Sequence, residues 1–114
     1  MANQRIDLPQ GALDLLILKT LALEPQHGWG ISERIQQVSE DVLQINQGSL
    51  YPCLHRLEHQ GWIEAEWAVS ELGRRARYYR LTPAGRRHLT REQSRWQQVV
   101  DAVHALMQPR EQEG

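Results

Sequence analysis

The chain of 114 residues contains one cysteine, Cys53, and lacks any long uninterrupted apolar run. A single cysteine cannot form an internal disulfide and leaves no cysteine framework for a metal ion. The most apolar stretch, residues 13–23, is interrupted by polar side chains and falls short of the roughly 18–20 residues that cross a bilayer. The N-terminus shows no basic segment followed by an apolar core, so we expect a cytoplasmic protein with no secretory signal and no membrane partner.

Lysine is nearly absent, and the charged residues are unevenly distributed. The formal net charge is only −1, and the 13 basic residues comprise 12 arginines and one lysine. Residues 1–73 carry ten acidic and four basic side chains, whereas residues 74–95 carry eight arginines and one glutamate. An arginine-rich segment in an otherwise acidic chain indicates a phosphate-bearing partner. The alternative is a solvated helix face.

Apolar side chains at helical spacing predict three short helices in the first half of the chain. The first begins near Pro9 and ends before Glu24-Pro25, because the residue before a proline avoids helical angles. Its apolar side chains cover more than one face, so we expect this helix to be buried on two sides. They are Leu13, Leu15, Leu16, Ile17, Leu18, Leu21 and Leu23.

The second helix follows a predicted turn at Gly28-Trp29-Gly30. Its inner face takes Ile31, Ile35 and either Val38 or Val42, which continue the helical spacing. The next break in the pattern is the polar segment 46–49, which separates this helix from the third.

The third helix is predicted over about residues 50–60, with a stripe of three leucines at positions 50, 54 and 57. Ser49 suits the N-cap, which would place Pro52 in the first turn, where its missing N–H costs nothing. Gly61 suits the position just after the helix.

The hydrophobic period then changes from helix to strand. Residues 62–69 roughly alternate, residues 76–81 form a second strand, and the segment 70–75 between them makes a hairpin. Thr82-Pro83 is a strong helix start, and we expect one long helix over 83–108. The predicted fold is mainly α with a small antiparallel hairpin. It comprises a winged helix-turn-helix over 1–82, a C-terminal dimerisation helix over 83–108 and a polar tail over 109–114.

A winged helix-turn-helix binds duplex DNA through its third helix and its hairpin. A helical wheel places hydrogen-bonding side chains opposite the leucine stripe of the third helix, although any exposed helix face is polar. We expect helix 46–61 in the major groove and the hairpin 70–77 on the flanking backbone. The candidate DNA-binding residues are Gln47, Ser49, Tyr51, Pro52, His55, Arg56, Arg74, Arg75 and Arg77.

The sequence gives little support to an enzyme, a metal site or a cofactor site. His55 and His59 have an i, i+4 ligand spacing, but no third ligand shares their face. Cys53 lies on the other side of the helix, among leucines, where it acts as a small apolar residue. We find no Ser-His-Asp constellation and no glycine loop that could cradle a phosphate, so we expect no catalytic residue and no cofactor.

The last helix carries an apolar seam that the compact part of the domain is too small to cover. The seam consists of Trp96, Val99, Val100, Val103 and Met107. We expect it to form a homodimer, with Leu13 and Leu16 of the first helix supplying the opposing surface. The alternatives are packing of the seam on the same chain's first helix, and a protein-interaction module that binds no specific DNA.

Several segments resemble PadR-type bacterial transcriptional regulators over about residues 8–107. They are Leu8-Pro9-Gln10-Gly11-Ala12-Leu13, Leu16-Ile17-Leu18, His27-Gly28-Trp29-Gly30-Ile31, Gly48-Ser49-Leu50-Tyr51-Pro52, Leu54, Arg56-Leu57-Glu58, Gly61-Trp62-Ile63 and Arg77-Tyr79-Leu81-Thr82-Gly85. The resemblance implies a homodimeric repressor on a pseudo-palindromic operator, of the short branch with one helix after the wing, which exchanges across the dimer.

The resemblance also bears on individual residues. Some short-branch members are similar in carrying a tryptophan on the last helix that lines a drug-binding pore, to which Trp96 could correspond. The implied ligand is a small planar aromatic effector. Trp29 replaces a common tyrosine and Cys53 a common alanine, and we expect neither on the DNA face.

Overall fold

The computed structural model describes residue 8 and residues 10–109, and it confirms the predicted fold class. Its elements are α1 (Gln10–Leu23), β1 (Gln26–His27), α2 (Gly28–Val38), α3 (Gln47–His59), β2 (Ile63–Val69), β3 (Arg75–Leu81) and α4 (Pro83–Met107). The expected helix start at Pro9 and the tail from residue 110 onward lie outside the described residues. Within the described ranges, no helix combines the length and apolarity needed to cross a membrane.

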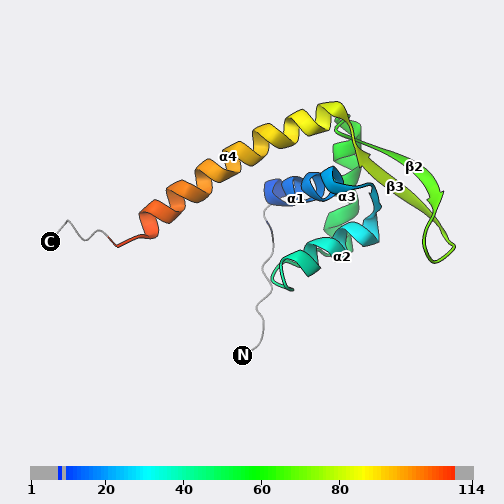
Figure 1. Ribbon diagram of the computed structural model, residues 1–114, viewed down its shortest axis with the longest axis horizontal. Helices are drawn as coiled ribbons and strands as arrows, with labels where there is room; N and C mark the ends of the chain where they lie inside the picture. Colours follow the sequence, from blue (N-terminus) through cyan, green and yellow to red (C-terminus); the bar gives the residue numbers. More distant parts are fainter. Residues whose placement is uncertain (1–7, 9, 110–114) are drawn as a thin grey trace.

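Helix α1 is the centre of the core. Ile17 and Leu18 on its different faces are fully buried, which confirms the expectation of burial on two sides, whereas Leu23 at its end is 60% exposed. The leucine stripe of α3 is fully buried in the same cluster. Figure 1 shows α1, α2 and α3 gathered beside the first half of α4, whose second half extends beyond them.

Strands β2 and β3 form the predicted hairpin, called the wing below. Its turn has Gly73 at φ +79°, a left-handed angle that favours glycine, and Ser70 N–H donates to the Arg74 carbonyl at 2.7 Å. The short strand β1 adds a third, unpredicted strand on the other side of β3, in the order β1-β3-β2. Two residues are too few to show a hydrophobic period, so the sequence pattern could not reveal β1.

The predicted turn at Gly28-Trp29-Gly30 is wrong, because these residues form the first turn of α2. His27 is the N-cap, and its Nδ1 accepts from Gly30 N–H at 3.0 Å. The inner face of α2 contains Ile31 and Ile35 as expected. Val38 and Val42 are 70% and 44% exposed, so neither belongs to the core.

Helix α3 begins three residues earlier than predicted. Asn46, not Ser49, is the N-cap, and its Oδ1 accepts from Ser49 N–H at 3.1 Å. Pro52 therefore lies in the second turn rather than the first, where its missing N–H leaves the Gly48 carbonyl without its helical donor. Gly61 follows the helix at φ +81°, as predicted.

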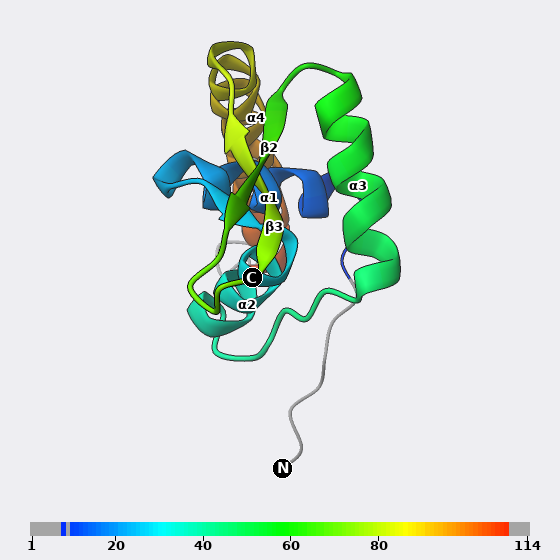
Figure 2. The same cartoon turned by 90° about the vertical axis from the view of Figure 1, so that its right-hand side faces the viewer.

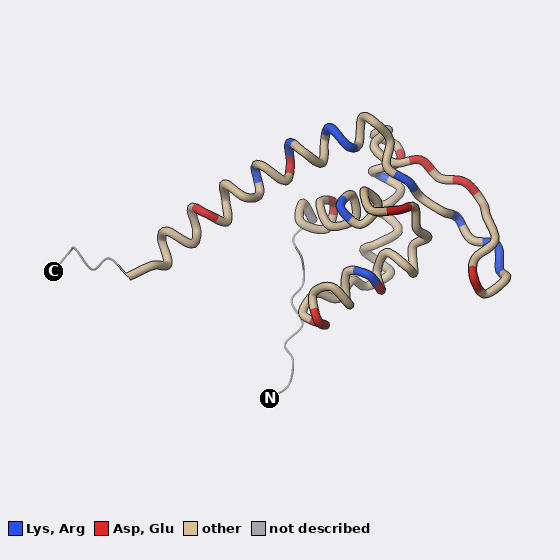
Figure 3. The backbone as a smooth tube through the Cα atoms, in the orientation of Figure 1, with Lys and Arg blue, Asp and Glu red and all other residues tan. Residues whose placement is uncertain are grey.

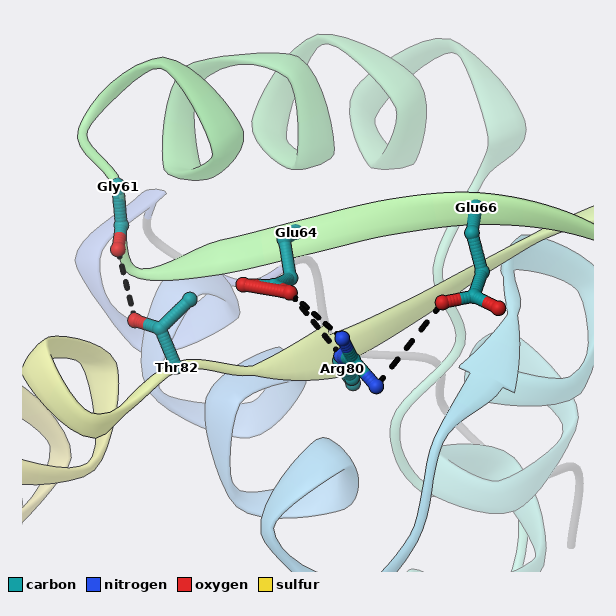
Figure 4. A network of polar contacts seen from close by, with 5 residues as sticks. All are labelled: Gly61, Glu64, Glu66, Arg80 and Thr82. Carbon is teal, nitrogen blue, oxygen red and sulfur yellow. Dashed lines mark hydrogen bonds and ion pairs between the residues drawn. The ribbon is translucent and has the colours of Figure 1, made fainter.

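The start of α4 is joined to the end of α3 by polar contacts. Thr82 caps α4 as predicted, since its Oγ1 accepts from Gly85 N–H at 2.9 Å. The same hydroxyl donates to the Gly61 carbonyl at 2.7 Å (Figure 4), and Thr82 N–H donates to the Trp62 carbonyl at 3.1 Å. These contacts set the direction in which α4 leaves the body.

Candidate nucleic-acid interface

Helix α3 presents a polar face to solvent on the side opposite its leucines. Tyr51, at 47% exposure, lies on this face, and the helix carries four other exposed candidates. Ser49, Pro52 and His55 share this side. Gln47, the fourth, lies near the leucine side in the first turn, where its amide donates to the Ser32 hydroxyl of α2 at 3.5 Å. Figure 2 looks onto the side of the molecule where the wing runs in front and α3 stands beside it.

Arg56 does not belong to this open face. Its guanidinium pairs with the carboxylate of Asp14 on α1, and the two side chains are 35% and 23% exposed. The Cys53 thiol donates to the same carboxylate at 2.7 Å. The Asp14 carboxylate also raises the pKa of Arg56 by accepting its hydrogen bond. Arg56 therefore joins α3 to α1.

Cys53 is an inert thiol at neutral pH. Burial, followed by the hydrogen bond to Asp14, raises its pKa to about 12, so it stays protonated. The side chain is 2% exposed, as the sequence predicted for a small core residue. Among the described residues, no group of three His, Cys, Asp or Glu side chains could hold a metal ion.

The two faces of the wing differ in charge. Strand alternation and the pairing of Trp67 with Arg77 place Trp67, Arg75 and Arg77 on one face, called the inner face. On the opposite, outer face, Arg80 contacts Glu64 at 2.8 Å and Glu66 at 3.9 Å (Figure 4).

The inner-face arginines have different partners. Arg75 lies over the Trp67 ring at 4.9 Å from its centroid, a cation–π contact. Arg77 pairs with Glu58 of α3 at 2.7 Å and so holds the wing against that helix. Arg74 at the turn is exposed. Of the three candidates, Arg74 and Arg75 are the ones whose guanidinium groups have no carboxylate partner among the described residues.

The arginine-rich segment is divided between two places in the fold. Figure 3 shows basic positions along β3 and the wing turn, and a second series along the first half of α4. Arg86, Arg87 and Arg91 belong to this second series and are exposed. The charge count over residues 74–95 therefore overstates the positive charge on the wing, because Arg77 and Arg80 are paired and four of the eight arginines lie on α4.

A groove of about 770 Å³ separates the inner face of the wing from the first turn of α2 and from Tyr51 of α3. We call it the wing groove. The Tyr51 hydroxyl lies against the backbone of Gly28, where an added Cβ would be 2.6 Å from the hydroxyl oxygen and 2.9 Å from the nearest ring carbons. The close approach of the Tyr51 side chain therefore requires a glycine at position 28, whereas the backbone angles there do not.

The apolar seam of α4 is uncovered in the single chain. Trp96, Val99, Val100 and Val103 are 44%, 53%, 39% and 52% exposed, and Met107 at the end of the seam is 78% exposed. On α1, Leu16 is half-buried, whereas Leu13 is 6% exposed and belongs to the chain's own core. A shallow hollow of about 250 Å³ lies between the start of α1 and the region around Trp96.

Three residues of this region were not identified from the sequence. Asp14 is an acidic residue within the apolar run of a helix that is expected to be buried on two sides. A carboxylate in such a place indicates a cationic partner, and this was the signal available in the sequence. Gly28 and Trp29 were assigned to a turn, so their place beside Tyr51 could not be inferred. No periodic pattern links α2 to the wing, because their contact is purely tertiary.

Comparisons with known proteins identify the family. The model of the transcriptional regulator PadR-like family matches residues 17–91. A transcriptional regulator of Mycobacterium tuberculosis, Rv3488, is 35% identical over 97 residues, which cover 85% of this chain and 87% of that protein.

Solved structures show the same arrangement of elements. A transcriptional regulator from Clostridium thermocellum aligns with a TM-score of 0.79 at 26% identity, covering 87% of this chain and 93% of the other. A PadR-like transcriptional regulator from Bacillus cereus aligns at 0.77 and 28% identity, covering 89% and 96%. Both the family and these neighbours are transcriptional regulators, not enzymes. The chain belongs to the transcriptional regulator PadR-like family.

Proposed function

We propose that this chain is a cytoplasmic, sequence-specific DNA-binding repressor that acts as a homodimer on a pseudo-palindromic operator. Helix α3 enters the major groove, and the wing contacts the flanking backbone. The observation that carries the proposal is the position of Tyr51 and Arg75, which line one groove although they come from α3 and the wing. Duplex DNA fits both elements, because it presents phosphates to guanidinium groups beside base edges that a recognition helix can contact.

The candidate residues take different roles in this proposal. Gln47, Ser49, Tyr51 and His55 offer hydrogen-bonding groups to base edges and phosphates, and Pro52 supplies an apolar contact between them. Arg74 and Arg75 bind phosphates. Arg56 and Arg77 border the DNA, and each is partly neutralised by an ion pair with a neighbouring element.

The dimer is proposed to form through the α4 seam. An exposed stripe of one tryptophan, three valines and a methionine would otherwise be left in water. Leu16 of α1 borders an apolar hollow that also includes Leu23 and Val38, both largely exposed. This hollow and the seam are the apolar surfaces that a second copy would cover together, and Leu13 would support them from the core.

DNA titrations test the proposal. The unmodified chain should bind a duplex from its own upstream region more tightly than a scrambled duplex, with an affinity that falls as salt rises. Arg75→Ala should weaken both complexes alike and flatten the salt slope by about one unit for each subunit of the dimer. Arg80→Ala on the outer face of the same hairpin is the matched control and should change neither quantity. Equal effects of Arg75→Ala and Arg80→Ala would contradict the placement of the wing.

Gly28→Ala should separate folding from DNA binding. The added Cβ meets the end of the Tyr51 side chain, which can swing aside, so the thermal midpoint should change little. Because Tyr51 then leaves its place beside the groove, operator affinity should fall about tenfold. Fluorescence anisotropy with labelled duplex measures this, and Tyr51→Ala should give a similar loss. Full affinity in Gly28→Ala would show that the position of Tyr51 is irrelevant.

Asp14→Asn should release Arg56 and strengthen binding to every duplex. The free guanidinium adds one uncompensated charge beside α3 in each subunit, so affinity should rise severalfold and the salt slope should steepen by about one unit per subunit. The free energy of unfolding should fall by about 1 kcal/mol, because the ion pair is only partly exposed.

Asp101→Asn, an equal charge change on the exposed face of α4, is the control for Asp14→Asn and should leave DNA binding nearly unchanged. If Arg56 instead recognises a base directly, Arg56→Ala will cost about 1–3 kcal/mol of binding and relax the preference at one position. A uniform loss across sequences in Arg56→Ala would mean that Arg56 contacts the DNA backbone.

A planar aromatic effector is proposed at Trp96. Two copies of this half-exposed indole near a dimer axis would make a slot for a flat cation or neutral compound. Such a ligand changes DNA affinity only through its different affinities for the two dimer states. Tryptophan fluorescence against a panel of flat dyes tests this, with Trp96→Ala as the control. Quenching that persists in Trp96→Ala would remove the effector from the proposal.

The second candidate function is a protein-interaction module that uses the α4 seam without specific DNA binding. The exposure of the seam is the observation that favours it. The titrations above separate the two functions, because an interaction module would show neither a preference for one duplex nor a salt slope that depends on Arg75.

A further inference from the structure

Trp29 is a large apolar side chain that the core does not use. It lies in the first turn of α2 and is 62% exposed, whereas the next core position, Ile31, is fully buried. It lines the wing groove together with Tyr51, Trp67 and Arg75. The sequence predicted that Trp29 would not lie on the DNA face, whereas in the structure it lines the same groove as Tyr51 and Arg75.

The groove combines aromatic rings with cations. Trp67 and Arg75 on the wing are already in cation–π contact, and Trp29 comes from α2, a separate element of the groove lining. Glu33 and Glu71 also line the groove, so its charge is mixed rather than uniformly positive. A sugar–phosphate strand presents anionic phosphates for the guanidinium groups of Arg74 and Arg75 and neutral deoxyribose rings for the indole rings of Trp29 and Trp67.

We propose that Trp29 is a DNA-backbone contact. Its ring packs on a deoxyribose, and its indole Nε1–H donates to a phosphate oxygen of the strand that Arg75 binds across the groove. The indole N–H only donates hydrogen bonds, and phosphate oxygens only accept them, so the two groups match. Contacts to the DNA backbone do not depend on the base sequence. This inference rests on the proposed DNA-binding function, and it assigns α2 a direct share in it.

Two substitutions test the two parts of the contact. Trp29→Ala should weaken binding to operator and scrambled duplex by the same factor, about tenfold. Trp29→Phe keeps an aromatic ring but removes the donor, so its loss should be intermediate, about threefold. Val42→Ala, an exposed apolar position just beyond the other end of the same helix, should stay within about twofold of the unmodified chain. Thermal midpoints of all variants should agree, because Trp29 packs little against the core.

Arg75→Ala is measured in the same series to separate this inference from the proposed function. If Arg75→Ala weakens DNA binding but Trp29→Ala binds with the affinity of the unmodified chain, the Trp29 contact is overturned and the proposed repressor function stands. A loss confined to the operator in Trp29→Ala overturns the backbone assignment, because it would mean base recognition. An unmodified chain that binds neither duplex overturns both.

Discussion

Gly85→Ala is expected to destabilise the fold more than any surface substitution in this chain. A Cβ at Gly85 would overlap the carbonyl oxygen of Trp62 and lie 2.8 Å from its carbonyl carbon. These are backbone atoms, and the same Trp62 carbonyl accepts from Thr82 N–H, so it cannot move aside without breaking the junction between β2 and α4. Overpacking against rigid backbone should cost about 3 kcal/mol or more.

Thermal unfolding followed by circular dichroism measures the effect. A loss of about 3 kcal/mol lowers the midpoint of a domain of this size by roughly 15 °C. Gly11→Ala is the matched control, since a Cβ there meets no atom within 4 Å, and its midpoint should equal or exceed that of the unmodified chain. An unchanged midpoint in Gly85→Ala would mean that α4 can tilt freely on the wing, contrary to the contacts of Thr82.

Val100→Asp is expected to dissociate the proposed homodimer. Val100 is the least exposed valine of the α4 seam, at 39%, and a second copy would bury it further. Each subunit would then carry an unpaired carboxylate in the interface, at a cost of several kcal/mol, so the dissociation constant should rise more than about a hundredfold. Operator affinity should collapse with it, because the two recognition helices must remain about 34 Å apart to occupy both half-sites.

Sedimentation at micromolar concentration measures the dimer, and anisotropy measures operator binding. Gln98→Asp makes a similar change on the opposite side of α4 and should sediment as the unmodified chain does. Val103→Asp should repeat the effect of Val100→Asp. An unmodified chain that is monomeric at this concentration, or a Val100→Asp variant that still dimerises, would remove the α4 seam from the interface.

The helices and the hairpin could be predicted because each rests on local signals. The leucine stripe of α3, the Thr82-Pro83 start of α4 and the glycine turn at Gly73 depend on spacing and backbone preference within a few residues. The start of α2 was missed because glycines favour a turn locally, whereas the His27 cap and the pairing of β1 with β3 stabilise a helix there.

The exposed positions of the candidate DNA face could be predicted from the sequence. Which of its arginines form ion pairs with carboxylates could not. A helical wheel orders side chains around α3, yet it contains no information on Asp14, which lies 42 residues before Arg56 in the chain. In the same way, strand alternation places Arg77 and Arg80 on opposite faces but does not show that each meets a glutamate.

The sequence by itself determined the family, the mainly α winged fold, the leucine core of α3 and the uncovered seam of α4, because these follow from periodicity and motif spacing. Only the tertiary structure decided which arginines are paired, that Tyr51 lies in the space left by Gly28, and that Trp29 shares a groove with the wing. The reason is physical: electrostatic pairing and close packing depend on distances between elements that are remote along the chain, and those distances exist only once the chain has folded.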